Sequence, residues 1–190
     1  CLVGSEMCIR DSYAEAKELL LRAVGEYPHN LGEGKLESGQ ENNLYYLLGL
    51  VQEKLGEAKD AFESLTRACC GESEPVGMMY YNDQPPEMIY YQGLAYRMLG
   101  EEEQAVRRFQ KLVDYGREHI RDDVKIDYFA VSLPDLLIFE ENLNERNRKH
   151  CLFMMSLGLK GLGRIDEAEK CAEELLAMDN AHQEIRVHDL

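Results

Sequence analysis

The feature of this 190-residue chain that most constrains its fold is a set of offsets that occurs three times. Each set begins with a small residue and continues after seven, five, four and three residues. The three sets are Gly49, Gly56, Ala61, Leu65 and Ala68; Gly93, Gly100, Ala105, Phe109 and Leu112; and Ser156, Gly163, Ala168, Ala172 and Leu175. Small side chains let two helices approach closely, a glycine permits the tight turn between them, and larger apolar residues fill the remaining space. The pattern therefore predicts helical hairpins.

These segments resemble the tetratricopeptide repeat, a helical hairpin with a period of 34 residues. A partial copy precedes them, in which Ala16, Leu20, Ala23 and Pro28 keep the offsets of a second helix and its terminating proline. The resemblance implies an all-α fold, a right-handed α-solenoid of three full hairpins and one truncated hairpin. In such arrays the first helix of each hairpin lines a concave surface that is available to partners.

Extra residues separate the copies, because the turn glycines at 56, 100 and 163 lie further apart than one repeat length. We expect a partial repeat at 13–29, full repeats at about 41–71, 86–118 and 149–180, and an insertion at 119–148. The insertion is apolar and includes Tyr128, Phe129, Leu137 and Phe139. Two interpretations stay open for these side chains: an interface for a partner, or a cover for one side of the repeats.

The first twelve residues, Cys1–Ser12, resemble a translated sequencing adapter, since Leu2–Asp11 match its codons one by one. We therefore predict that residues 1–12 are a non-native tail and exclude them from the fold. In this interpretation, the true N-terminus and the first helix of the partial copy are missing.

A closer resemblance covers residues 13–190 and is carried by the run 124–139 and by Leu143, Asn144, Arg146, Asn147, His150 and Cys151 after it. This stretch is similar to the C-terminal repeat region of large bacterial proteins. The resemblance implies an upstream β-rich domain of uncharacterised function, associated in some interpretations with carbohydrates. Any chemistry of such a parent protein would reside in that upstream domain.

The formal net charge of −15 argues against nucleic acid as a partner, because such binding depends on Lys and Arg neutralising phosphates. It also disfavours an anionic membrane surface, and the sequence has no run of eighteen apolar residues. Outside the tail, Cys69, Cys70, Cys151 and Cys171 lack the spacing of a zinc site, so we predict no metal. This cysteine usage favours a reducing compartment such as the cytoplasm.

The candidate binding residues come from the predicted first helices. An aromatic residue stands three positions before the small residue of each copy, at Tyr46, Tyr90 and Phe153. Four positions after the small residue, Arg97 in the second copy and Lys160 in the third project from roughly the same face as the aromatic residue. Aromatic anchors beside a cation are typical of interaction hot spots, so these five residues form the predicted partner-binding groove. The alternative is that the aromatics pack between adjacent hairpins.

We predict no enzyme and no cofactor. The residues best suited to catalysis, if there were any, would be an acidic cluster that includes Asp122 and Asp123, near His119 and His150. Paired carboxylates can perform acid and base chemistry, but acidic clusters usually form solvated surfaces. Two functions remain: a scaffold that binds another protein, or an ancillary domain that packs against the upstream part of a larger bacterial, carbohydrate-active protein.

Overall fold

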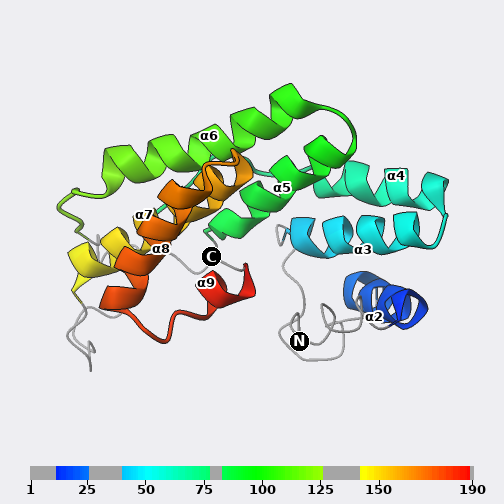
Figure 1. Ribbon diagram of the computed structural model, residues 1–190, viewed down its shortest axis with the longest axis horizontal. Coiled ribbons are helices and arrows are strands. Elements are labelled where there is room, and N and C mark those ends of the chain that lie inside the picture. The colour runs from blue at the N-terminus through cyan, green and yellow to red at the C-terminus, as the bar shows by residue number, and fades with distance from the viewer. Residues whose placement is uncertain (1–11, 26–39, 78–82, 126–141, 189–190) are drawn as a thin grey trace. The chain divides into compact units, whose positions relative to one another are not determined.

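The computed structural model describes residues 12–25, 40–77, 83–125 and 142–188. All regular secondary structure in these ranges is α-helical, which confirms the predicted all-α class. The helices are α2 (Tyr13–Gly25), α3 (Asn42–Lys54), α4 (Ala58–Ala68), α5 (Pro86–Met98), α6 (Glu102–His119), α7 (Leu143–Gly161), α8 (Ile165–Met178) and α9 (Gln183–Val187), as Figure 1 shows. The handedness of the array and the number of its hairpins stay predictions.

The three predicted turns share one hydrogen-bonding pattern. Gly56, Gly100 and Gly163 each have a positive φ, of 79°, 81° and 74°. Each glycine N–H donates to the carbonyl three residues earlier, and the next N–H donates to the carbonyl five residues before it. In the α3–α4 turn, these bonds join Gly56 to Glu53 at 3.0 Å and Glu57 to Gln52 at 2.9 Å. This is a Schellman termination, in which an L side chain at the glycine position would be strained.

The small residues of the first helices lie where predicted, against the second helices. A Cβ at Gly49 would lie 2.7 Å from Leu65 Cγ, and a Cβ at Gly93 would lie 2.7 Å from Phe109 Cζ. In the third copy, Ser156 is fully buried and its hydroxyl donates to the Phe153 carbonyl. The small residues of the repeated pattern therefore mark positions where two helices are in close contact.

Contacts between residues divide the chain into two compact units. Unit 1 comprises residues 1–74 and 86–109, and unit 2 comprises residues 75–85 and 110–190. Helix α6 therefore contributes its residues up to Phe109 to unit 1 and those from Gln110 to unit 2.

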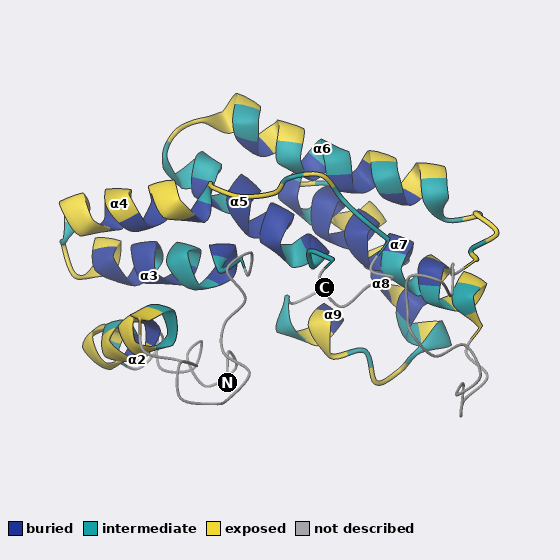
Figure 2. Cartoon of the chain, turned by 180° about the vertical axis from the view of Figure 1, so that it is seen from behind, coloured by how far each residue is buried: buried dark blue, intermediate teal, exposed yellow. Residues whose placement is uncertain are grey.

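Unit 1 is built on the α3–α4 hairpin. Helix α2 packs on α3, and α5 packs on both α3 and α4. Ala16 and Leu20 of α2 meet the apolar face of α3 in a cluster completed by Leu47, Leu48 and Val51. A second cluster joins α4 to α5 through Leu65, Ala68 and Ala95. Figure 2 shows that the buried residues of α3, α4 and α5 lie along the sides that face one another.

Two buried amides fasten the end of α4 in unit 1. The Asn42 side chain donates to the carbonyls of Ala68 and Cys70, at 2.8 and 2.7 Å. The Gln92 side chain donates to the carbonyls of Cys70 and Glu72, and its oxygen accepts a bond from Arg108 Nε at 3.0 Å. These bonds satisfy the Ala68 carbonyl, which the end of the helix leaves without an intrahelical donor, and the carbonyls of Cys70 and Glu72 beyond it.

Unit 2 is built on the α7–α8 hairpin. Its core includes Leu152, Leu157 and Leu175, and α9 adds Ile185, which is fully buried. The part of α6 in this unit closely approaches α7, since a Cβ at Gly116 would lie 2.8 Å from the Cys151 carbonyl oxygen.

Helix α7 begins at Leu143, inside the range predicted as an insertion. Its N-cap is Asn142, whose side chain accepts from the Glu145 amide at 3.2 Å. The sequence Asn-x-x-Glu is a variant of the capping box, so the polar residues after 142 start a helix instead of continuing a loop.

Candidate interaction surface

In unit 1 the structure brings together three of the predicted groove residues, Tyr46, Tyr90 and Arg97. They are linked by a row of rings that runs from α3 through α5 to α6. The distances between ring centres are 5.5 Å for Tyr46 and Tyr91, 5.8 Å for Tyr91 and Tyr90, and 5.7 Å for Tyr90 and Phe109. The row ends at Arg97, whose guanidinium lies 4.9 Å from the centre of the Phe109 ring. Ring pairs at these separations attract one another, as do a guanidinium and a ring face.

Arg97 is held in a fixed orientation by Glu102. Its Nε and Nη2 both donate to that carboxylate, at distances from 2.8 to 3.2 Å. These hydrogen bonds raise the pKa of Arg97 and lower that of Glu102. Because the guanidinium is both paired and stacked, it is presented in one geometry and little side-chain freedom remains to be lost on binding.

The two tyrosines are neutral hydrogen-bonding groups. Burial raises the pKa of Tyr90 to about 12, the nearby Tyr46 phenol adds to that rise, and Arg97 opposes it. Burial also raises the pKa of Tyr46, and Arg97 again opposes the rise. Both phenols therefore keep their protons at neutral pH, and the surface carries one cation that is paired with one carboxylate.

The groove residues of unit 1 differ in accessibility. Tyr90 is only 7% exposed, whereas Tyr46 is half-buried and the Arg97 side chain is 38% exposed. Leu50 lies one turn after Tyr46, and Leu94 lies one turn before Arg97; both are half-buried. Helical spacing therefore puts Leu50 on the side of α3 that carries Tyr46 and Leu94 on the side of α5 that carries Arg97, and Arg97 lies near enough to Tyr46 to affect its pKa. We call these four residues the α3–α5 face.

In unit 2 the other two predicted groove residues lie under the C-terminal segment. Phe153 is 4% exposed and its ring lies 5.3 Å from the His182 ring and 5.9 Å from the His188 ring. The Lys160 ammonium group donates to the backbone carbonyl of His188. Both side chains therefore contact the C-terminal segment of the same chain.

These contacts favour the alternative interpretation of the repeated aromatics. Tyr46 packs against the next first helix through Tyr91, and Phe153 packs against the rings that flank α9. The repeated aromatic position therefore joins neighbouring helices. The predicted insertion interface, Tyr128, Phe129, Leu137 and Phe139, lies outside the described residues.

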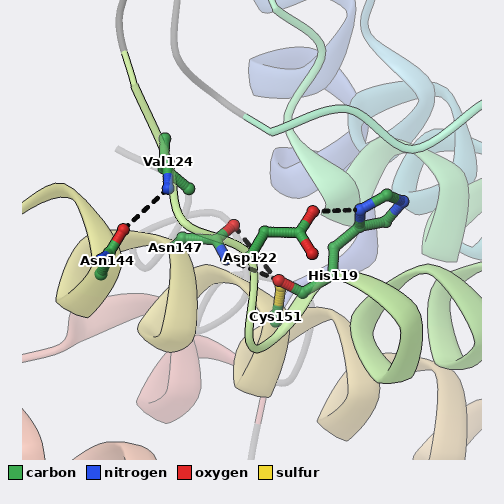
Figure 3. A network of polar contacts seen from close by, with 6 residues as sticks. All are labelled: His119, Asp122, Val124, Asn144, Asn147 and Cys151. Carbon is green, nitrogen blue, oxygen red and sulfur yellow. Dashed lines mark hydrogen bonds and ion pairs between the residues drawn. The ribbon is translucent and has the colours of Figure 1, made fainter.

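Asp122, from the acidic cluster considered for catalysis, forms part of a polar network at the start of α7 (Figure 3). His119 Nδ1 lies 2.7 Å from Asp122 Oδ2, and the Asn147 side chain donates to the His119 carbonyl at 2.7 Å. The Asn144 side chain accepts from the Val124 amide at 2.8 Å. The network fastens the segment that follows α6 to α7.

The network places a thiol next to a His–Asp pair, but in an environment that disfavours a nucleophile. Cys151 Sγ lies 3.7 Å from Asn147 Oδ1 and the residue is fully buried. Burial raises the pKa of this thiol to about 12, and Asp122 adds to the rise. A reactive cysteine requires the opposite shift, so the arrangement favours a structural role.

The half-buried His150 also contacts the backbone: its Nε2 lies 2.8 Å from the Val76 carbonyl oxygen. In the described ranges, no group of three or more His, Cys, Asp or Glu side chains is arranged to hold a metal ion. No helix in these ranges is long and apolar enough to cross a membrane.

Sequence reasoning missed Glu102, Tyr91 and the two histidines around α9. Glu102 is five residues beyond Arg97, across a turn, so only the turn geometry brings the two together. The signal for Tyr91 was present in the Tyr90–Tyr91 pair, but one aromatic was assigned to each copy.

Comparison with known proteins identifies the repeat. Residues 87–115, which cover α5 and most of α6, match the tetratricopeptide repeat family. Residues 87–115 are therefore similar to one tetratricopeptide repeat. Repeats of this family are typical of non-catalytic modules that bind other proteins. The crystal structure of MamA is similar with 18% identity, over 95% of this chain and 77% of that chain, at a TM-score of 0.31. At that score the likeness supports no argument about function.

Proposed function

We propose that this chain is a scaffold that holds a partner protein against the α3–α5 face. The single observation that supports this most strongly is the fixed orientation of a partly exposed Arg97 beside half-buried Tyr46, Leu50 and Leu94. Tyr and Arg anchors next to aliphatic side chains are the composition that hot spots favour.

The face fits a partner that contributes a short apolar segment with a polar or acidic group. Leu50 and Leu94 offer apolar contact, and the Tyr46 hydroxyl offers a hydrogen bond. The rigid Arg97 adds directional donors. Its pairing with Glu102 limits the net charge of the face, so we expect hydrogen bonding and apolar burial to contribute more than long-range attraction.

Site-specific photo-crosslinking tests this proposal. A photoreactive phenylalanine analogue replaces Tyr46 in the full chain, and the variant is irradiated in an extract of the source organism. The matched control places the same analogue at Lys59 of α4, whose side chain is 88% exposed. We expect a discrete adduct from position 46, absent from position 59 and weakened by Arg97→Ala.

Identical adducts from positions 46 and 59, or none from position 46, would contradict the proposal. Peptide mapping of the adduct separates two kinds of partner. A separate polypeptide indicates a free-standing scaffold, whereas another domain of the same polypeptide indicates the ancillary role in a larger protein.

A further inference from the structure

The C-terminal segment of unit 2 lies on the face of α7 that carries two predicted groove residues. Ile185 of α9 is fully buried, and the rings of His182 and His188 flank Phe153. The Lys160 ammonium group donates to the His188 carbonyl just beyond the end of α9, where a cation also complements the helix dipole. Phe153 is buried beneath these contacts, and Lys160 is half-buried beside them.

Relative to α7, this segment takes the place that a neighbouring first helix takes in unit 1. Phe153 precedes the small residue Ser156 by three positions, as Tyr46 precedes Gly49. Tyr46 packs on Tyr91 of α5, whereas Phe153 packs on the histidines at the two ends of α9. The face of α7 therefore accepts a short amphipathic helix, and residues 182–188 provide it.

The segment is short, and its residues are exposed or partly exposed around one buried side chain. Helix α9 has five residues, a length at which an isolated helix is not stable in water, so its conformation depends on the α7 face. One of its side chains, Ile185, is fully buried, while Gln183, Glu184 and Arg186 are exposed. The exposed turn that precedes it is held by a bond from the Ala181 amide to Asp179 Oδ1 at 3.1 Å.

We propose that residues 182–188 are an intramolecular ligand of the α7 face, and that a partner reaches Phe153 and Lys160 only after this segment has left. The contact is autoinhibitory: it occupies the side of α7 on which another amphipathic helix could pack, as α5 packs on α3 through Tyr91 and Tyr46. The inference rests on the proposed scaffold role, but its test requires no partner and can fail or succeed independently of the crosslinking at Tyr46.

The test uses the full chain and a fluorescein-labelled peptide with the sequence of residues 179–190. The variant Ile185→Asp places a charge at the buried position and should release the segment. By fluorescence anisotropy, we expect this variant to bind the peptide at least tenfold more tightly than the unmodified chain. The matched control Gln183→Asp adds the same charge at an exposed neighbour and should behave like the unmodified chain. Adding Phe153→Ala to Ile185→Asp should abolish binding.

Hydrogen exchange provides a second measurement. In Ile185→Asp, the amides of residues 183–187 should exchange faster while those of α7 and α8 stay protected. Equal peptide binding by the unmodified chain and by Ile185→Asp would overturn the proposal, as would no binding by a folded Ile185→Asp. If that variant loses the α7–α8 helices, the milder Ile185→Ala decides, because it weakens the attached segment and leaves the α7 face unchanged. It should raise peptide binding with α7 and α8 intact, and an unchanged affinity would overturn the proposal.

Discussion

At the level of single residues, the hairpins depend on positions that have no room for a larger side chain. Gly93 is tighter than Gly49, the other small residue of the first helices in unit 1, because the ring of Phe109 fills the space where a Cβ would stand. Phe109 is itself fully buried and stacked under Arg97, so it has little freedom to move aside. The glycine is therefore required by packing and not by backbone conformation.

We expect Gly93→Ala to lower the free energy of unfolding by about 1–3 kcal/mol, the usual cost of forcing an extra carbon into a packed core. Urea titration followed by circular dichroism measures the change. Gly25→Ala is the control, since Gly25 is exposed at the end of α2 and a Cβ there would meet no atom within 4 Å, and it should cause no loss. Equal stability of Gly93→Ala and the unmodified chain would contradict the close-contact argument.

His150 makes stability depend on pH. Burial lowers the pKa of this imidazole, and Arg146 and His182 lower it further, while the Val76 carbonyl and Asp83 oppose them. The folded chain thus favours the neutral form, whereas the unfolded chain takes up a proton at the ordinary pKa of about 6.5. The stabilisation is complete above that pKa and is lost as the pH falls from there through the folded-state pKa.

Between pH 7.5 and 5.5, His150→Gln should lose less unfolding free energy than the unmodified chain, because glutamine has no proton to gain and can still donate to Val76. Paired urea titrations at the two pH values give the difference. A decline of the same size in both proteins would show that His150 does not carry the effect.

At the level of elements, the sequence predicts where the turns lie, but it does not predict which helices pack next to one another. The offsets around Gly56, Gly100 and Gly163 encode local bonds within a few residues, so the sequence predicts them directly. The burial of Tyr90 and Phe153 depends on which helix packs next to them. Helix α9 is too short to show a hydrophobic period, so its position over α7 had no signal in the sequence.

Gln92 joins three elements, because its amide binds the end of α4 and the segment beyond it while accepting a bond from α6. Gln92→Leu keeps a similar volume but removes these bonds. We expect a loss of about 1–3 kcal/mol, the cost of leaving buried polar groups without partners. The control Gln110→Leu removes an exposed bond to Asp114 and should be nearly neutral in the same urea titration. Comparable losses in both variants would refute the special role of Gln92.

At the level of the whole molecule, the described helices form two compact units that share the continuous helix α6. The sequence predicts one repeat domain at 13–190, and it indicates neither this division nor the start of α7 at Leu143. Both depend on contacts between segments far apart in the chain, which a period of 34 residues does not describe. The predicted tail at 1–12 lies outside the described residues except for Ser12.

Ser12 marks where the tail should be cut. Its carbonyl accepts from the Ala16 amide at 3.0 Å and its hydroxyl from the Glu15 amide at 3.4 Å, which is the arrangement of a helix cap. Deleting residues 1–11 should therefore leave the far-ultraviolet circular dichroism per molecule unchanged. Deleting residue 12 as well should destabilise α2 by about 0.5–2 kcal/mol. A large loss of helix on the first deletion would contradict the view of residues 1–11 as a foreign tail.

The three Schellman turns have a consequence for how this chain can change over time. Each turn has Leu followed by Gly and then a charged residue, in Leu55-Gly-Glu, Leu99-Gly-Glu and Leu162-Gly-Arg, and each contains the same number of residues. The segments between the hairpins differ in length, since the turn glycines at 56, 100 and 163 are unequally spaced, whereas an insertion inside a turn would shift the register of the paired helices. Each hairpin thus keeps its own internal turn as a unit. A hairpin should therefore be duplicated, deleted or grafted without loss of folding when the breakpoints fall between the hairpins.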